Sequence, residues 1–397
     1  MTFSSYDIER TYDWNYAHAP AVPAIDVPNC AGAWDFCGLP LASPLGVPAG
    51  PLLNGRWILY YAALGFDVLT YKTVRSVERA SYTLPNLLPV RGEVTAFDPI
   101  VTADAGIGDS WAISFGMPSR DPQVWERDVE AARRGLPGGK VLVVSVVASP
   151  GDDWTLDRIA ADYAYCAGTA IGAGAHAVEA NLSCPNVSSR EGRLYESATA
   201  SQAIASAIRQ RIGDAPLVLK VGIFERREQA EAFVRAVDGI ADAISTTNTI
   251  AARVIDAEGK PLFNGSRRGI GGRLIGARCL RELNLLRAIV ADAGARLRLV
   301  SVGGVASAED VVDRLAAGAH HVQIATAAMQ NPGIAIDIRK RLDTLPTMNT
   351  LAAENKVVAS GVSSAAPRRC SGRPERSSKG EASAEAVGRT RNRAGGS

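Results

Sequence analysis

The chain has few cysteines for its length, and their spacing gives them no common task. Six cysteines occur among 397 residues, and no two of them form a CxxC pair. This scatter argues against a disulfide scaffold, an iron–sulfur centre or a structural metal site. We therefore expect reduced thiols, as in a protein of the cytoplasm.

Long apolar runs are missing as well. No stretch approaches the roughly 18 uninterrupted apolar residues of a membrane-spanning helix. The N-terminal segment Met1–Tyr16 is polar and acidic, without the apolar centre of a signal peptide. No glycine-rich dinucleotide fingerprint follows a candidate strand. We expect a cytoplasmic protein without a membrane span and without a nicotinamide-dinucleotide site of its own.

Neither sign of charge dominates, because the formal net charge is only +2. From Lys356 onward the chain has nine Lys/Arg and three Asp/Glu, which leaves about −4 for residues 1–355. A mildly acidic body presents no basic groove, so we expect no nucleic-acid partner. From Ala352 to Ser397 there is also no Leu, Ile, Phe, Trp, Tyr or Met. Such a segment cannot offset its ordering entropy, so residues 351–397 are predicted to be a disordered basic tail.

What the chain does have is a regular alternation of short apolar runs and amphipathic helices. Continuous apolar runs indicate parallel strands that are buried on both faces. Eight such strands with intervening helices favour a closed (β/α)8 TIM barrel, an α/β fold, over an open sheet. The runs are Leu45–Ala49, Val68–Lys72, Val141–Val147, Ala177–Asn181, Leu217–Val221, Ala243–Thr247, Leu299–Val302 and His320–Ile324. The clearest helices are Thr155–Ala173, Ala200–Ile212, Arg226–Val237, Arg278–Ala293 and Ala308–Ala316.

These patterns define the expected organisation of the chain. Residues 1–40 are predicted to be an irregular extension that wraps the outside or the bottom of the barrel. The barrel itself is assigned to residues 41–350. The long gap between its second and third strands, Thr73–Lys140, is predicted to be an insertion over the mouth.

Barrel enzymes carry their chemistry at the carboxyl ends of the strands. Glycines and small residues follow the last two runs, at Gly303-Gly304 and Ala325-Thr326. Barrels commonly bind a phosphate there. A glycine-rich segment before the seventh run, Gly269–Gly272, is expected to be a turn.

Two lysines, Lys72 and Lys220, stand at strand ends where apolar residues are usual. A buried lysine needs an anionic or electron-rich partner, and a reduced flavin is one such partner. A salt bridge at the barrel rim would explain either lysine without a cofactor. A lyase or isomerase that forms a Schiff base on Lys220 is a further alternative.

The most specific feature is the segment Asn181-Leu182-Ser183-Cys184-Pro185-Asn186, which follows the fourth run. Asparagine both donates and accepts hydrogen bonds, so two of them can bind a cyclic imide or a carboxylate. Cys184 lies on a loop among polar neighbours, where a thiol that is partly ionised can act as a base. A buried structural cysteine is the simpler alternative.

Together with Lys72, Lys220, Asn248-Thr249, Gly303-Gly304 and Gly269–Gly272, this segment resembles the dihydroorotate dehydrogenase family. More narrowly, it is similar to the soluble class of the family, in which the base is Cys rather than Ser. The resemblance runs in order from about Leu39 to Leu342. It implies an FMN-dependent enzyme that oxidises dihydroorotate to orotate in pyrimidine (UMP) biosynthesis.

The resemblance also implies roles for particular residues. Cys184 would remove the C5 proton of the dihydropyrimidine while hydride passes from C6 to flavin N5, with Lys72 beside both flavin and substrate. Asn181, Asn186, Asn248 and Thr249 would bind the substrate. The residues implied for FMN are Ala49, Gly50, Lys72, Thr73, Ser145, Asn181, Lys220, Gly272, Gly303, Gly304, Ala325 and Thr326. The family further implies a homodimer.

Two departures from the family pattern bear on the substrate. The segment Ile113–Pro118 resembles a substrate-binding turn that normally begins with Asn, and Ala325 replaces a usual glycine. One substrate hydrogen bond should therefore be missing, at a cost of roughly 1–3 kcal/mol. Asn54, Arg56 or Arg75 could supply a replacement contact.

Several alternatives stay open at this point. One is a related FMN-dependent dihydropyrimidine dehydrogenase or enone reductase that acts on a different ring. A binding paralogue without catalytic activity is another. If the chain is a dihydroorotate dehydrogenase, its electron acceptor would be a small soluble oxidant, a quinone or a partner subunit.

Overall fold

The structure is a computed structural model that describes residues 3–95, 98–151, 153–183 and 193–344. The predicted disordered tail, residues 351–397, lies outside the described residues. Within the described part of the chain, no helix is both long enough and apolar enough to cross a membrane.

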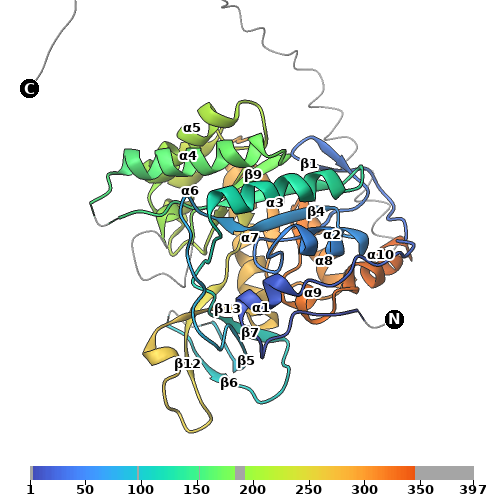
Figure 1. The fold of residues 1–397 in the computed structure, drawn as a ribbon. Coiled ribbons are helices and arrows are strands. Elements are labelled where there is room, and N and C mark those ends of the chain that lie inside the picture. Colours follow the sequence, from blue (N-terminus) through green and yellow to red (C-terminus); the bar gives the residue numbers. More distant parts are fainter. Residues whose placement is uncertain (1–2, 96–97, 152, 184–192, 345–397) are drawn as a thin grey trace, which may run out of the picture. The chain divides into compact units, whose positions relative to one another are not determined.

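Eight parallel strands form a closed barrel, in the order in which they follow one another along the chain. Each predicted apolar run is one of these strands, so the (β/α)8 TIM barrel is confirmed (Figure 1). The strands are β3 (Leu45–Val47), β4 (Val68–Val74), β8 (Val141–Val146), β9 (Ala177–Asn181), β10 (Leu217–Val221), β11 (Ala243–Thr246), β14 (Arg298–Val302) and β15 (His321–Gln323).

Helices follow the barrel strands and surround them. All five helices predicted from periodicity are present, with ends within two residues of those expected. Hydroxyl side chains begin several of them; Thr155 and Ser307, for example, accept hydrogen bonds from the N–H groups of Arg158 and Asp310. The helices are α2 (Gly55–Ala63), α3 (Pro122–Gly135), α4 (Leu156–Gly172), α5 (Ala198–Ile212), α6 (Arg227–Val237), α7 (Gly276–Asp292), α8 (Ala308–Ala316), α9 (Thr326–Gln330) and α10 (Ile334–Thr344).

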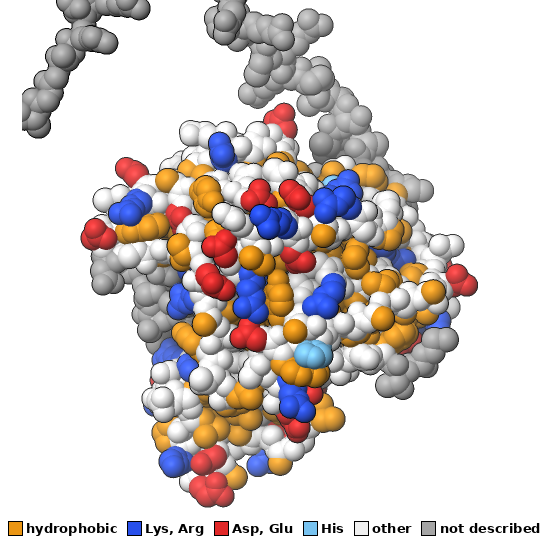
Figure 2. Space-filling model, viewed as in Figure 1, with side chains coloured by type: hydrophobic (Ala, Val, Ile, Leu, Met, Phe, Trp, Pro, Cys, Tyr) orange, Lys and Arg blue, Asp and Glu red, His pale blue; other side chains and the backbone are white. Residues whose placement is uncertain are grey.

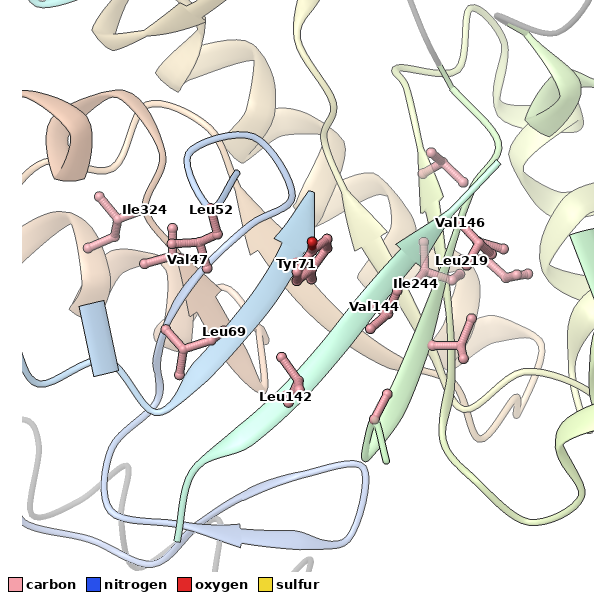
Figure 3. Close-up of a cluster of buried hydrophobic side chains, with 14 of the residues drawn as sticks. Val47, Leu52, Leu69, Tyr71, Leu142, Val144, Val146, Leu219, Ile244 and Ile324 are labelled. Carbon is pink, nitrogen blue, oxygen red and sulfur yellow. The ribbon is translucent and has the colours of Figure 1, made fainter. Parts of the chain in front are cut away.

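The main hydrophobic core lies between the barrel and these helices. Side chains on the outer faces of the strands, such as Leu69, Leu142 and Leu219, are completely buried in it (Figure 3). The intervening residues of each strand point into the barrel, because side chains alternate along a strand. This alternation directs Thr70 and Lys72 of β4 into the barrel interior.

The N-terminal extension contains more regular structure than expected, so the prediction of an irregular segment is wrong in part. Helix α1 (Tyr12–Ala17) lies near the mouth of the barrel, where Tyr12 is buried. Strands β1 (Trp34–Phe36) and β2 (Leu39–Leu41) form a hairpin. Phe36 packs on Val68 and other valines inside the barrel, so the hairpin closes the end opposite the mouth.

A second, smaller barrel of five strands adjoins the first. Three of its strands come from the predicted insertion, and two follow β11 (Figure 1). It has its own apolar core, which includes Val90, Val101 and Ile270. The strands are β5 (Leu87–Gly92), β6 (Ile100–Ala103), β7 (Ser110–Ile113), β12 (Ile250–Ile255) and β13 (Arg268–Gly272).

The expectation of a turn at Gly269–Gly272 is wrong, because these residues belong to strand β13. Tertiary pairing overrides their weak strand propensity, since β13 is hydrogen-bonded to β12 on one side and to β7 on the other. Glycine allows the close approach: a Cβ on Gly272 would lie 2.2 Å from the Asp109 carbonyl oxygen.

On the face shown in Figure 2, Lys/Arg and Asp/Glu side chains intermingle over the helices. Surface ion pairs of the protein include that of Arg120 with Asp13, in which the charged atoms lie 2.6 Å apart. This face therefore presents no continuous surface of one charge.

Candidate active site

A large cavity opens at the carboxyl ends of the barrel strands. Its empty volume is about 1270 Å³, including the space open to solvent at its mouth. Most residues implied by the family resemblance line this one cavity, although they come from widely separated parts of the chain. They are Ala49, Gly50, Lys72, Thr73, Asn181, Lys220, Asn248, Thr249, Gly272, Gly303, Gly304, Ala325 and Thr326.

The other three predicted residues are Cys184, Asn186 and Ser145. Cys184 and Asn186 lie outside the described residues. Ser145 is completely buried inside the barrel, where its hydroxyl lies 3.0 Å from that of Thr73. Ser145 is therefore positioned to support Thr73 from below.

The three polar residues suggested as replacements for the missing substrate contact lie elsewhere, so that suggestion is wrong. Asn54 caps helix α2, and Arg56 donates to the Tyr16 and Ala17 carbonyls. Arg75 donates to the Ala148 carbonyl at 2.6 Å. Each serves the packing of a loop or a helix end, because an unpaired backbone carbonyl is costly to bury.

Two aromatic rings and a backbone carbonyl surround the ammonium group of Lys72. Its ammonium is 4.2 Å from the centre of the Phe115 ring and 5.6 Å from that of Tyr12. It also donates to the Gly50 carbonyl at 3.4 Å. The aromatic faces stabilise the cation, so helix α1 and the second barrel both help to position this lysine.

Lys220 is held differently, from within the barrel. Its ammonium lies 3.7 Å from a carboxylate oxygen of Glu179, and both side chains are almost completely buried. An ion pair at the barrel rim was the simple alternative for this lysine. The pair lies in the barrel interior instead, with Lys220 facing the cavity and Glu179 behind it.

The two described asparagines of the site contact each other. Asn248 donates from Nδ2 to Asn181 Oδ1 at 3.3 Å, and also to the Ser183 carbonyl. Asn181 Oδ1 accepts in addition from the Ser183 N–H at 3.2 Å. The backbone that leads to Cys184 is thus fixed at the cavity edge by residues of two strand ends.

A concave stretch of backbone forms the opposite end of the cavity. Gly272, Gly303 and Gly304 have φ values of +94°, +103° and +78°, which favour glycine. A Cβ on Gly304 would lie 2.1 Å from Gly276 Cα. Ala325 has φ −102°, so alanine causes no backbone strain where the family has glycine. Such a cradle fits a phosphate group.

An apolar wall that the sequence did not reveal faces these polar groups. It comes largely from the second barrel, and Ile113 belongs to it: a Cβ on Gly271 would lie 3.2 Å from Ile113 Cδ1. The resemblance of segment Ile113–Pro118 to a substrate-binding turn indicated part of this wall. No sequence pattern around the other two members, Leu87 and Trp111, predicted that they line the cavity. The members are Leu87, Trp111, Ile113, Phe115 and Met117.

The described cysteines are all free, and none of them lines the cavity. Burial raises the pKa of the Cys30 thiol to about 11, that of Cys37 to about 12 and that of Cys279 to about 11. Burial also raises the pKa of Cys166. These thiols stay neutral near pH 7 and are poor bases.

A closed parallel barrel with a polar mouth and a glycine cradle at its strand ends is the architecture of a (β/α)8-barrel enzyme. The sequence profile of the family described as "Dihydroorotate dehydrogenase" matches residues 114–345. This chain belongs to that family.

Two relatives and a solved structure illustrate the similarity. The "Dihydroorotate dehydrogenase" of Dictyostelium discoideum is 32% identical over 366 residues, covering 83% of this chain and 95% of the relative. The "Dihydroorotate dehydrogenase (quinone)" of Leifsonia xyli subsp. xyli is 28% identical, covering 82% and 92%. The Eimeria tenella enzyme solved in complex with ferulenol has a TM-score of 0.68 at 16% identity, covering 83% and 88%, and supports the fold.

Proposed function

We propose that this protein is an FMN-dependent dihydroorotate dehydrogenase, which oxidises dihydroorotate to orotate in pyrimidine biosynthesis. The observation that carries the proposal is the convergence of Lys72, Lys220, Asn181 and Asn248 on one cavity that ends in a glycine cradle. The names of the relatives favour dihydroorotate over a different ring. No carbonyl chemistry on Lys220 is needed to explain this arrangement.

The cavity fits FMN on the evidence of its backbone. Gly272, Gly303 and Gly304 have positive φ values, and a Cβ on any of them would meet neighbouring protein atoms, so only glycine gives this backbone its concave form. A concave backbone of this kind suits a bound phosphate. Thr326 and Ala325 complete this end, and Ala49 and Gly50 offer a small-residue surface for a flat ring. When bound, FMN supplies the acceptor for a hydride from C6 of the substrate.

The substrate is assigned to the polar side of the cavity. Asn181, Asn248 and Thr249 offer amide and hydroxyl groups that match the imide and the carboxylate of dihydroorotate. Lys72 lies at the same side and supplies positive charge for the carboxylate. Asn186, outside the described residues, is proposed as a further substrate ligand.

We assign the base to Cys184, which makes this enzyme a member of the class with a cysteine base. Its predecessor Ser183 is tied to Asn181 and Asn248, so the loop begins at the substrate side. No described cysteine lines the cavity and could take this role. Cys184 would take the C5 proton, and its replacement by Ala should lower the rate of flavin reduction about 10²–10⁴-fold.

An anaerobic titration tests the proposal. The purified protein should be yellow, and its flavin absorbance should bleach on addition of dihydroorotate. A protein that binds FMN but keeps its colour with dihydroorotate, while dihydrouracil or a cyclic enone changes it, would disprove the assigned substrate. Cys166→Ala is a matched control, because this buried thiol on helix α4 does not line the cavity and should not affect the rate constant of bleaching.

The remaining features belong to the same proposal. The catalytic domain is the barrel of residues 41–350, and the protein acts as a homodimer. Quinone-linked and NAD-linked relatives both match this chain. Reoxidation of the bleached enzyme with a quinone, with NAD⁺ and with dioxygen, compared by rate, identifies the electron acceptor.

A further inference from the structure

The carboxylate of Glu179 is an unusual feature of the barrel interior. It lies on β9, one inward-facing position below Asn181, and its side chain is 2% exposed. Its closest ionic partner is the Lys220 ammonium at 3.7 Å, whose side chain is 5% exposed. A carboxylate in such surroundings carries a large desolvation cost, so its presence calls for a reason.

The surroundings of the pair are polar but poorly satisfied. Among the described residues, Glu179 Oε1 has no hydrogen-bond partner. The hydroxyl of Ser245, the residue of strand β11 that pairs with Lys220 of β10, has none either. Within the described part of the chain, the Lys220 ammonium donates no hydrogen bond, because even Glu179 lies too far away at 3.7 Å. The hydrogen-bonding capacity of the ammonium is therefore available to a ligand in the cavity, while Glu179 compensates its charge from behind.

Other titratable groups near the pair do not replace Glu179. Lys72 lines the same cavity and is itself positive. Asp109 and Arg273 also line it, and Arg273 is paired with Asp310. His321 is buried in the barrel, and burial lowers its pKa to about 3, so it is neutral. Ser245, Ser145 and Gln323 carry no charge.

We propose that Glu179 is a positioning residue for Lys220: the buried carboxylate keeps the ammonium protonated and directed into the cavity. The inference rests on the proposed function, because Lys220 is there a partner of the flavin. A lysine buried without a counter-charge loses its proton near neutral pH. Without Glu179, Lys220 should therefore change its charge within the working pH range, and the flavin should respond.

The test compares the midpoint potential of the enzyme-bound flavin between pH 5.5 and pH 9 in four proteins. They are the wild type, Glu179→Gln, Lys220→Met and the double variant. The glutamine variant should follow the wild type at low pH and Lys220→Met at high pH. This additional transition should be absent from the double variant, because the titrating group is then gone.

Two controls make the result specific. Ser245→Ala removes the other unsatisfied polar group beside Lys220 and should leave the pH profile unchanged. Glu179→Asp retains the negative charge and should show no additional transition. If the glutamine variant does not fold, Glu179→Met, which is also neutral, takes its place and should show the same additional transition. The proposal is overturned if Glu179→Gln has the pH profile of the wild type, or if its transition survives in the double variant.

A second readout separates this inference from the proposed function. A protein purified without flavin contradicts the proposed function, but the unfolding free energy still reports the charge of Lys220. In Glu179→Gln the buried ammonium has lost its counter-charge, so the folded state should favour its neutral form and stability should rise from pH 7 to pH 9 relative to the double variant. Parallel stability curves of the two variants would overturn the inference.

Discussion

Glu282 offers a quantitative test of how burial controls a charge in this enzyme. It lies on α7, is 4% exposed, and accepts a hydrogen bond from the Phe224 N–H at 3.1 Å. Burial raises the pKa of its carboxyl from 4.5 to about 7, although the Phe224 N–H and the charge of Arg278 act in the opposite direction. The loop that follows strand β10 and Lys220 is thereby tied to a group that titrates near neutral pH.

The sign of the effect follows from the direction of this change. The folded-state pKa lies above the unfolded-state value, so Glu282 contributes fully to stability below pH 4.5 and progressively less as the pH rises through 7. At 1.36 kcal/mol per pKa unit, the loss amounts to about 3 kcal/mol at pH 8. Glu282→Gln keeps an acceptor for the Phe224 N–H and does not ionise, so it avoids this loss.

The variant should therefore be more stable than the wild type at pH 8. Its advantage should grow by about 2 kcal/mol between pH 5.5 and pH 8. Urea unfolding followed by tryptophan fluorescence measures both proteins, with the exposed pair member Glu130→Gln as a control that shows no such trend. An advantage that stays constant over this pH range would refute the reasoning.

Two further predictions concern the two ends of the cavity. Gly304→Ala should abolish stable FMN binding, because the new Cβ meets Gly276 and the residue has a positive φ; spectroscopic flavin content measures this. Gly139→Ala, at a positive φ with no atom within 4 Å of its Cβ, should retain the flavin. Ile113→Asn should lower KM for dihydroorotate by about 5- to 150-fold, since one restored hydrogen bond is worth about 1–3 kcal/mol. Ile113→Val should leave this KM unchanged. Equal KM values for the wild type and both Ile113 variants would show that Ile113 does not face the substrate.

The sequence determined the main barrel nearly completely. A parallel strand that is buried on both faces requires a continuous apolar run, and this requirement is visible in a few neighbouring residues. The runs ending at Asn181 and Val221 coincide with strands β9 and β10 to the residue. Because the carboxyl ends of parallel strands meet at one mouth, the chain order also placed Lys72, Asn181, Lys220 and Asn248 together.

Only the tertiary structure decided what surrounds these residues. The second barrel joins strands β5–β7 to β12 and β13, which are more than 130 residues away, and no local pattern encodes such a pairing. This pairing made a strand of Gly269–Gly272 and brought Phe115 over Lys72. The contact of Glu179 with Lys220 likewise depends on the register of two neighbouring strands. Residue type at a strand end follows from short-range periodicity, whereas its partners depend on closure of the whole barrel.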